Sequence, residues 1–175
     1  MMGGPAQEYA GEWSPDGKQL VIPSSRTGRF ELYLVPVVGG QPRQITTSGS
    51  GTLETWSPDG KWIADPTPRA IVLISPVTAA AKTIAPKPLL DSAVFAGGVG
   101  WSADSQEIYF LIQDARGNED IGVMSVDGSN PRLLVRFDRP DMPMYRANFS
   151  TDGRSFYFPI GRQEADIWVM DLVRR

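Results

Sequence analysis

The sequence has 175 residues, with 17 Lys and Arg against 20 Asp and Glu, so its formal net charge is −3. This length allows one substantial core but is too short for two ordinary domains unless the core is assembled from repeats. The chain has no excess of basic residues of the kind that binds DNA or RNA. The absence of His and Cys excludes a Ser-His-Asp triad, acid–base catalysis by imidazole and most sets of zinc ligands. We therefore expect no nucleic-acid partner, no catalytic residue, no metal and no cofactor.

Membrane and export signals are also missing from the sequence. No apolar run approaches the roughly 18 residues of a membrane span. The first residues, MMGGPAQEYA, lack the basic and apolar regions of a signal peptide. We expect neither a membrane span nor an export signal in this chain.

A five-residue motif that begins with an aromatic residue recurs along the chain. WSPDG begins at Trp13 and again at Trp56, and altered forms, WSADS and FSTDG, begin at Trp101 and Phe149. The four aromatic positions are 43, 45 and 48 residues apart. Repeats of this period indicate a solenoid or a propeller.

Each repeat is predicted to contain short β-strands. Two apolar runs follow each copy of the five-residue motif, rich in β-branched and aromatic residues and bounded by Gly, Pro, Asp and Ser. Tight turns at Gly39-Gly40 and Asp127-Gly128 precede a last short strand, around 44–45 and 133–134. The segment ending at the aromatic adds a fourth strand. The predicted first runs are 20–22, 62–64, 108–111 and 156–158, and the second runs are 32–35, 71–74, 121–124 and 167–170.

Four antiparallel strands repeated every 40 to 50 residues predict an all-β propeller. A sheet of this size cannot bury both faces alone, but sheets stacked around an axis can. The aromatic is predicted to lie between neighbouring blades, and the following Pro-Asp-Gly is typical of a tight turn. The repeats run roughly from 7–46, 50–85, 95–135 and 143–175 in one domain. Their signature residues are Trp13, Asp16, Gly17, Trp56, Asp59, Gly60, Trp101, Asp104, Phe149, Asp152 and Gly153.

The stretch WSPDGKQLVIPSSRTGRFELYLVPVVGGQPRQIT, from Trp13 to Thr46, resembles the repeat of TolB-like β-propellers. The segment from Phe149 resembles the closing repeat of such proteins. Two departures stand out, since repeat two has Ala79-Ala80-Ala81 in place of Gly-Gly and repeat three has Ser105 in place of Gly. The resemblance implies a propeller that binds peptides or proteins without doing chemistry, in bacterial periplasmic or extracytoplasmic proteins.

The number of blades raises a further question. The resemblance implies six or more blades in a closed ring, and four repeats are visible. We expect either part of a larger propeller or a chain that completes its ring by self-association, because an open sheet invites pairing with another chain. A closed ring of four blades is the third alternative.

Two groups of residues are candidate binding sites. Residues at the innermost strands are predicted to line the central channel, and arginines at matching positions are predicted to lie on one rim, where guanidinium groups could bind a carboxylate or phosphate. The alternatives are that the channel residues only solvate a water-filled channel and that each arginine ties its own loop. The channel set is Glu12, Glu54, Thr55, Gly100, Arg146 and Asn148, and the rim set is Arg26, Arg69 and Arg162, with Arg116 two positions later in its repeat.

Other motifs favour structural roles. The turn aspartates are expected to form turns rather than a carboxylate cluster. The segment 114–120 spaces oxygen atoms as a calcium loop does, but Arg116 at its centre opposes that reading. The glycines in 97–100 are not followed by a helix that could bind phosphate, so close backbone packing is expected there. The sequon at Asn148 includes Phe149, which is expected to be buried.

The predicted function is a non-catalytic protein- or peptide-interaction module, the sensor or scaffold portion of a larger envelope protein. The alternative is the accessory propeller of a peptidase or another hydrolase or lyase, which would gate the substrate. Neither a Gly-x-Ser-x-Gly elbow nor a histidine is present, so the chemistry of the second class would have to come from another chain.

Overall fold

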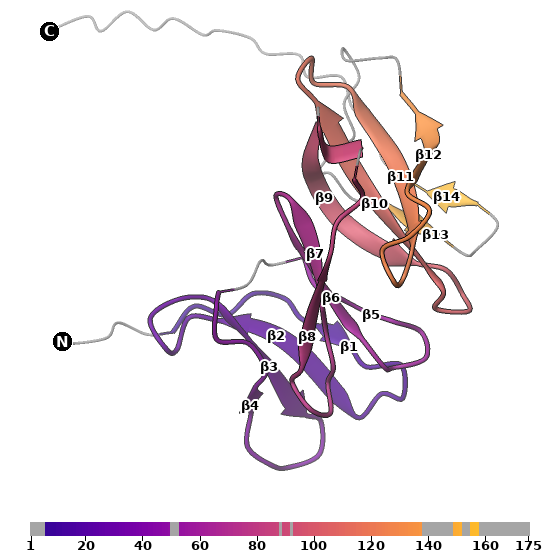
Figure 1. Cartoon of the computed structure of the whole chain (residues 1–175). Helices are drawn as coiled ribbons and strands as arrows, with labels where there is room; N and C mark the ends of the chain where they lie inside the picture. Colours follow the sequence, from indigo (N-terminus) through magenta and orange to yellow (C-terminus); the bar gives the residue numbers. More distant parts are fainter. Residues whose placement is uncertain are drawn as a thin grey trace, which may run out of the picture.

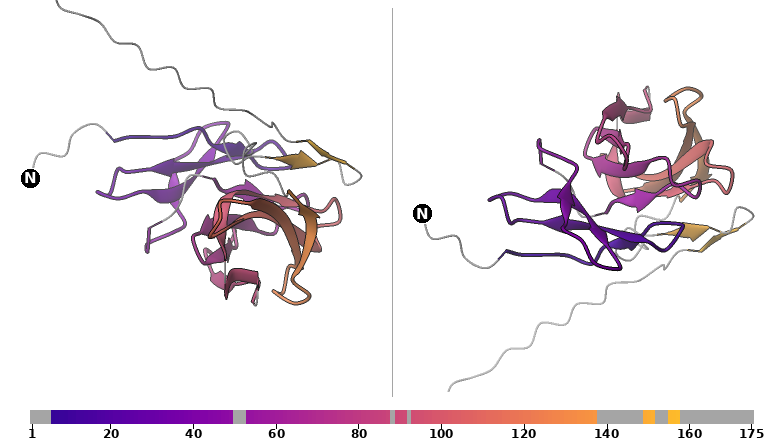
Figure 2. Two further views of the ribbon diagram at one scale, coloured as in Figure 1. Left: turned by 90° about the horizontal axis from the view of Figure 1, so that it is seen from above. Right: turned by 90° about the horizontal axis from the view of Figure 1, so that it is seen from below.

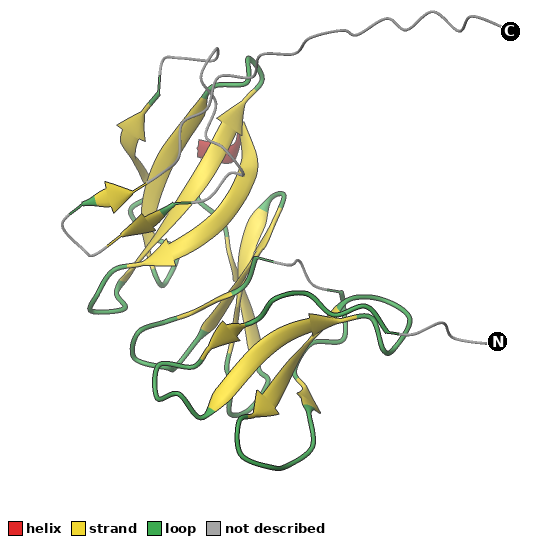
Figure 3. Ribbon diagram, turned by 180° about the vertical axis from the view of Figure 1, so that it is seen from behind, coloured by secondary structure: helices red, strands yellow, loops and turns green. Residues whose placement is uncertain are grey.

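A computed structural model describes residues 6–49, 53–87, 89–91, 93–137, 149–151 and 155–157. This part of the chain consists of β-strands joined by short turns, with one 3₁₀ turn, η1 (Leu89–Asp91). Figure 3 shows that turn as the helical element among the strands. Within these ranges no helix is long and apolar enough to cross a lipid bilayer.

The strands form successive antiparallel sheets in chain order, each a simple meander (Figure 1). The first sheet contains β1 (Glu12–Trp13), β2 (Gln19–Ser24), β3 (Glu31–Pro36) and β4 (Arg43–Gln44). The second contains β5 (Thr55–Trp56), β6 (Ile63–Thr67), β7 (Ala70–Ile74) and β8 (Ala81–Ile84). The third contains β9 (Ala93–Trp101), β10 (Glu107–Asp114), β11 (Glu119–Ser125) and β12 (Arg132–Arg136). Of the fourth, β13 (Ser150–Thr151) and β14 (Phe156–Tyr157) are described, and the run predicted at 167–170 lies outside the described residues.

The first and second sheets pack face to face. Trp56 pairs with Ile63, and Ile63 with Ile74, so these three side chains share one face of the second sheet. They form a core with the opposite sheet's Val21 and Leu34, among others. Trp56 is therefore the wedge between two blades, with 7% of its surface exposed.

The same arrangement repeats between the later sheets. Trp101 packs with Ile108 and Met124 of its own sheet against Leu73 and Ile84 of the second. On the other face of the third sheet, the core is continued by Phe149 and Phe156 of the fourth. Figure 2 shows the first three sheets arranged one after another in the order of the sequence. The predicted fold class, a propeller of four-stranded antiparallel blades, is confirmed as an open arc in the described part.

The prediction that the aromatic residue of every repeat is buried between blades is wrong for Trp13. Its side chain is 56% exposed, whereas Trp101, at the matching position, is 7% exposed. Trp13 lies beside Leu20 and Val35 on the face of the first sheet opposite the Trp56 core. No described sheet packs on that face. Trp13 thus occupies the position of an inter-blade aromatic, but no sheet that would cover it is among the described residues.

The turn after each of Trp13, Trp56 and Trp101 is held by a serine and an aspartate. The Ser14 hydroxyl donates to Asp16 Oδ1 at 2.7 Å, and the backbone amide of Lys18 donates to the same oxygen at 3.1 Å. Ser57 with Asp59 and Ser102 with Asp104 repeat this geometry at 2.7 and 2.6 Å. The glycine that follows has positive φ, 68° at Gly17. The aspartates therefore form the turns, as their positions in the sequence predict.

Ser105 takes the glycine position of the third repeat with a φ of 62°. Left-handed backbone is unfavourable for a residue with a side chain. The Ser105 hydroxyl accepts a hydrogen bond from the backbone amide of Asp59 at 3.0 Å, and the residue is buried. Serine at this position thus links the turns of two neighbouring blades, which glycine could not do.

Ala79 replaces a glycine in the β7–β8 hairpin and also has a positive φ, 59°. Replacing Ala79 with Gly is expected to raise the free energy of unfolding by about 0.5–1 kcal/mol, because glycine adopts this conformation without steric cost. Urea denaturation followed by circular dichroism measures the change. Ala80→Gly is the matched control, and it is expected to be neutral or destabilising. Equal effects of the two substitutions would contradict the assignment of strain to Ala79.

Candidate functional site

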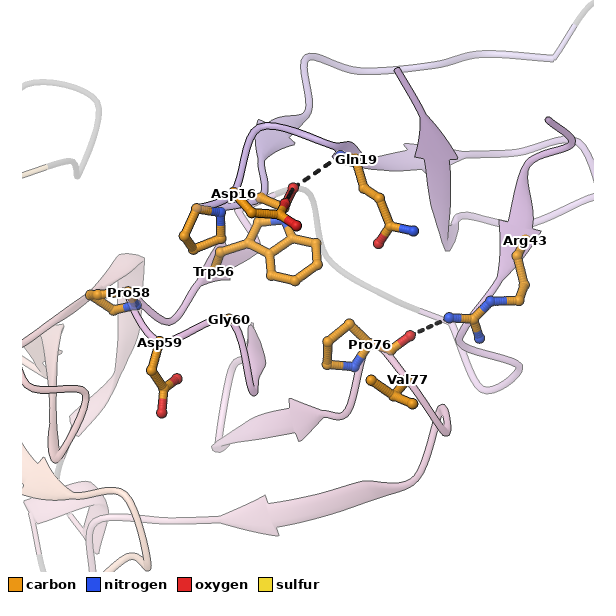
Figure 4. A pocket seen from close by; sticks show the side chains of 11 residues that line it. Asp16, Gln19, Arg43, Trp56, Pro58, Asp59, Gly60, Pro76 and Val77 are labelled. Atoms are coloured by element: carbon orange, nitrogen blue, oxygen red, sulfur yellow. Dashed lines mark hydrogen bonds between the residues drawn. The ribbon is translucent and has the colours of Figure 1, made fainter. Parts of the chain in front are cut away.

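A groove lies between the turns of the first and second sheets, with a volume of about 670 Å³ (Figure 4). Its walls come from the turns that follow Trp13 and Trp56, from the β7–β8 hairpin, and from Gln19 of β2 and Arg43 of β4. The residues that line it are Ser14, Pro15, Asp16, Gln19, Arg43, Trp56, Pro58, Asp59, Gly60, Pro76 and Val77. We call this hollow the inter-blade groove.

The inter-blade groove combines rigid apolar groups with fixed charges. The prolines and Val77, which is 82% exposed, supply the exposed apolar surface, and the buried Trp56 borders it. Arg43 donates from its guanidinium to the carbonyl oxygen of Pro76, so this contact joins the two sheets across the groove. Such a lining suits recognition of a chain segment with both apolar and polar groups.

The two groove aspartates are held as carboxylates by the turns. The hydrogen bond from the Ser14 hydroxyl, followed by that from the Lys18 amide, lowers the pKa of Asp16. Burial raises the pKa of Asp59, but the hydrogen bonds from Lys61 and Ser57 outweigh it and the net shift is downward. Both side chains therefore carry negative charge at neutral pH.

A second hollow of about 260 Å³ lies at the inner strands of the blades. It includes three of the predicted channel residues, and we call it the channel pocket. It is lined by Ala10, Gly11, Glu12, Leu53, Glu54, Thr55, Gly98, Val99 and Phe149. Arg146 and Asn148, also predicted for the channel, lie outside the described residues.

The residue before each of Trp13, Trp56 and Trp101 lies against the aromatic residue of the next blade. Glu12 Oε2 accepts a hydrogen bond from the backbone amide of Trp56 at 2.5 Å. Thr55 Oγ1 accepts one from the Trp101 indole at 3.0 Å. A Cβ atom on Gly100 would lie 3.0 Å from the ring of Phe149. These positions thus serve blade-to-blade packing, which the sequence pattern did not reveal, while Glu12 and Thr55 also border the channel pocket.

Glu54 is the most unusual group of the channel pocket. It is 6% exposed, and its Oε2 atom has no hydrogen-bond partner among the described residues. Burial, with smaller contributions from the negative charges of Asp65 and Glu12, raises the pKa of Glu54 to about 8. Burial also raises the pKa of Glu12, against the opposing hydrogen bond from Trp56. The pocket is therefore an acidic site in which charge is costly.

The predicted rim arginines do not form one described site. Arg26 donates to Ser24 Oγ at 3.0 Å and to Glu8 Oε1 at 2.5 Å, so it ties its own loop. Arg69 is exposed and lines a separate hollow of about 290 Å³ with Asp91 and Asp114. Arg162 lies outside the described residues, as do the signature residues Asp152 and Gly153.

The calcium-like segment is a hairpin turn. Asp114 Oδ1 accepts backbone hydrogen bonds from Arg116 at 2.8 Å and from Asn118 at 2.9 Å. The hydrogen bond from the Asn118 side chain contributes most to lowering the pKa of Asp114. Across the described ranges, no group of three or more Asp and Glu side chains is arranged to hold a metal ion. The glycines in 97–100 lie within strand β9.

No family model matches the sequence. Among solved structures, a putative TolB from Agrobacterium tumefaciens superposes with a TM-score of 0.61 over 91% of this chain and 72% of its own, at 19% identity. The fold is that of a TolB-like β-propeller. A puromycin hydrolase S511A mutant complexed with PGG gives a TM-score of 0.64 at 19% identity, over 89% of this chain and 25% of the hydrolase. An oligogalacturonate lyase in complex with manganese gives 0.61 at 12% identity, over 71% of this chain and 38% of the lyase.

One curated protein is similar in sequence over a shorter stretch. An uncharacterized peptidase, YuxL, of Bacillus subtilis (strain 168) is 42% identical over 53 residues. The alignment covers 29% of this chain and 8% of the peptidase. The chain spans 8% of this peptidase, 25% of the hydrolase and 38% of the lyase, and similarity at this level establishes the fold alone.

Proposed function

We propose that this chain is a non-catalytic protein- or peptide-binding propeller module and that the inter-blade groove is its recognition surface. The observation that carries the proposal is the lining of the groove, where several prolines and the exposed Val77 lie beside fixed charges in an open hollow of about 670 Å³. Proline side chains lose little conformational entropy on binding, and charged groups at the margin select the partner. The absence of His and Cys favours recognition over chemistry.

Val77 offers a direct test because it lines the groove and is 82% exposed, so its replacement should not disturb the core. Peptides selected on the purified chain from a random 12-residue display library are expected to bind with micromolar affinity. Val77→Asp is expected to weaken that binding at least tenfold, because it places a charge on an apolar contact. Isothermal titration calorimetry measures both affinities.

Val38→Asp is the matched control, since Val38 is 92% exposed and lies outside the groove lining. It is expected to change the affinity less than twofold. Failure to select any peptide, or equal effects of the two aspartates, would overturn the proposal.

The alternative function is that of an accessory propeller that gates substrate for a hydrolase or lyase. It is favoured by the similarity to the puromycin hydrolase and to YuxL. In that case the catalytic groups would belong to another domain or chain. The Val77→Asp variant would then change the KM of the associated enzyme, with no stable peptide complex of the propeller alone.

We further infer that the open face of the first sheet, which includes Trp13, Leu20 and Val35, is covered by another blade. A second copy of this chain could supply it by the same sheet-to-sheet packing that buries Trp56. Similarity to TolB also supports an extracytoplasmic location in bacteria, as the sensor or scaffold part of a larger envelope protein.

A further inference from the structure

We propose that the channel pocket binds an organic cation, an ammonium or guanidinium group, through the carboxylates of Glu54 and Glu12. This site is separate from the inter-blade groove and shares no lining residue with it. The proposal therefore goes beyond the recognition surface above and does not depend on it.

The first argument is the state of Glu54. A buried carboxylate without a partner is costly, and folded proteins normally pair it with hydrogen bonds or an opposite charge. Glu54 is 6% exposed, lines the pocket, and has an Oε2 atom with no hydrogen-bond partner in the described part of the chain. None of the ion pairs formed by the described residues includes Glu54 or Glu12. A bound cation would supply the missing partner.

The second argument is the composition of the pocket wall. Glu12 from β1 adds a second carboxylate, and Asp65 from β6 adds negative potential at Glu54. Phe149 lines the same pocket, and an aromatic ring attracts a cation to its face. Carboxylates next to an aromatic ring favour an alkylammonium or guanidinium group. The volume of about 260 Å³ is large enough for such a group, and the described residues provide no group of three or more side chains arranged to hold a metal ion.

The experiment uses small probes of defined charge on the whole chain, followed by two-dimensional ¹⁵N NMR. N-acetyl-arginine amide is expected to bind at least tenfold more tightly than N-acetyl-citrulline amide, its neutral analogue. The shifted amides are expected to include Thr55 and Gly98, which line the pocket. Glu54→Gln is expected to abolish the preference for the charged probe while leaving the chain folded, because the amide has the same shape.

Glu12→Gln is the second variant, and it is expected to reduce the preference. Glu107→Gln removes the same charge from β10 outside the pocket, and it is expected to leave the preference unchanged. Alanine amide, which carries a free α-ammonium group, distinguishes the source of the cation. Tighter binding of alanine amide would assign the site to a peptide amino terminus, and tighter binding of the arginine probe to a side chain.

Three outcomes would overturn the proposal. The first is equal affinity for the arginine and citrulline probes, and the second is a set of shifts confined to the groove around Val77. The third is displacement of the probe by millimolar CaCl₂ in a manner that requires Glu54, which would assign the pocket to a metal ion. The Val77→Asp variant keeps this test distinct from that of the groove, since it should leave binding of the arginine probe intact.

Discussion

Trp56→Ala and Trp101→Ala are each expected to lower the free energy of unfolding by about 3–5 kcal/mol. Each indole is 7% exposed and packs between two sheets, so its loss leaves a cavity that neither sheet can fill. Trp101→Ala also leaves Thr55 Oγ1 without the hydrogen bond it accepts from the indole. Urea denaturation followed by circular dichroism measures the change.

Trp13→Ala is the matched control, because the same residue type occupies the same position of its repeat but is 56% exposed. It is expected to cost about 1 kcal/mol or less in dilute solution. A cost that grows with protein concentration would indicate that a second copy covers the open face, and light scattering would then show a mass above that of the monomer. Equal costs for all three tryptophans in dilute solution would contradict the role assigned to the wedge.

Much of the fold could be predicted from the sequence because its strands are short, local and punctuated by turn residues. The runs at 20–22, 32–35 and 71–74 lie within β2, β3 and β7. The hairpin at Ala79 was harder to predict, since positive φ at an alanine has no signal in its residue type. The repeat pattern could not predict the exposure of the Trp13 side chain either, because burial of the aromatic residue depends on whether another sheet packs against it.

The candidate sites were less predictable for a different reason. The sequence placed Glu12, Glu54 and Thr55 near the axis, and the structure brings all three to one pocket. The sequence did not indicate that Arg43, Pro76 and Val77 line a groove together with the turns that follow Trp13 and Trp56. Those residues come from different blades and follow no motif. Contacts between repeats depend on how the sheets stack, and a pattern within one repeat does not record that.

Glu54→Gln is expected to make the chain more stable at pH 9 by on the order of 2–4 kcal/mol, and to leave stability at pH 4.5 nearly unchanged. The carboxyl of Glu54 has its pKa raised from 4.5 to about 8 by burial and by the negative charges of Asp65 and Glu12. The folded state therefore binds the proton more tightly than the unfolded state. The stability that this provides is complete below about pH 4.5 and is lost progressively as the pH rises to about 8.

Urea denaturation of both proteins between pH 4.5 and 9 measures this difference, and Glu107→Gln on β10 is the control for removal of a partly exposed charge, which is paired with Arg132 at 2.9 Å. Because burial also raises the pKa of Glu12, some decline with pH should remain in the Glu54→Gln variant. Parallel profiles for the wild type and the Glu54→Gln variant would contradict the buried state of this carboxyl.

The same titration separates a proton from a cation as the partner of Glu54. Proton uptake and cation binding are competing ways to neutralise one carboxylate, so the arginine probe should bind more tightly as the pH rises from 6 to 9. A saturating concentration of the probe should also restore stability at pH 9 in the wild type and have no effect on Glu54→Gln. In the absence of a cation the pocket is most stable when Glu54 is protonated, and a bound cation would make its ionised form the stable one.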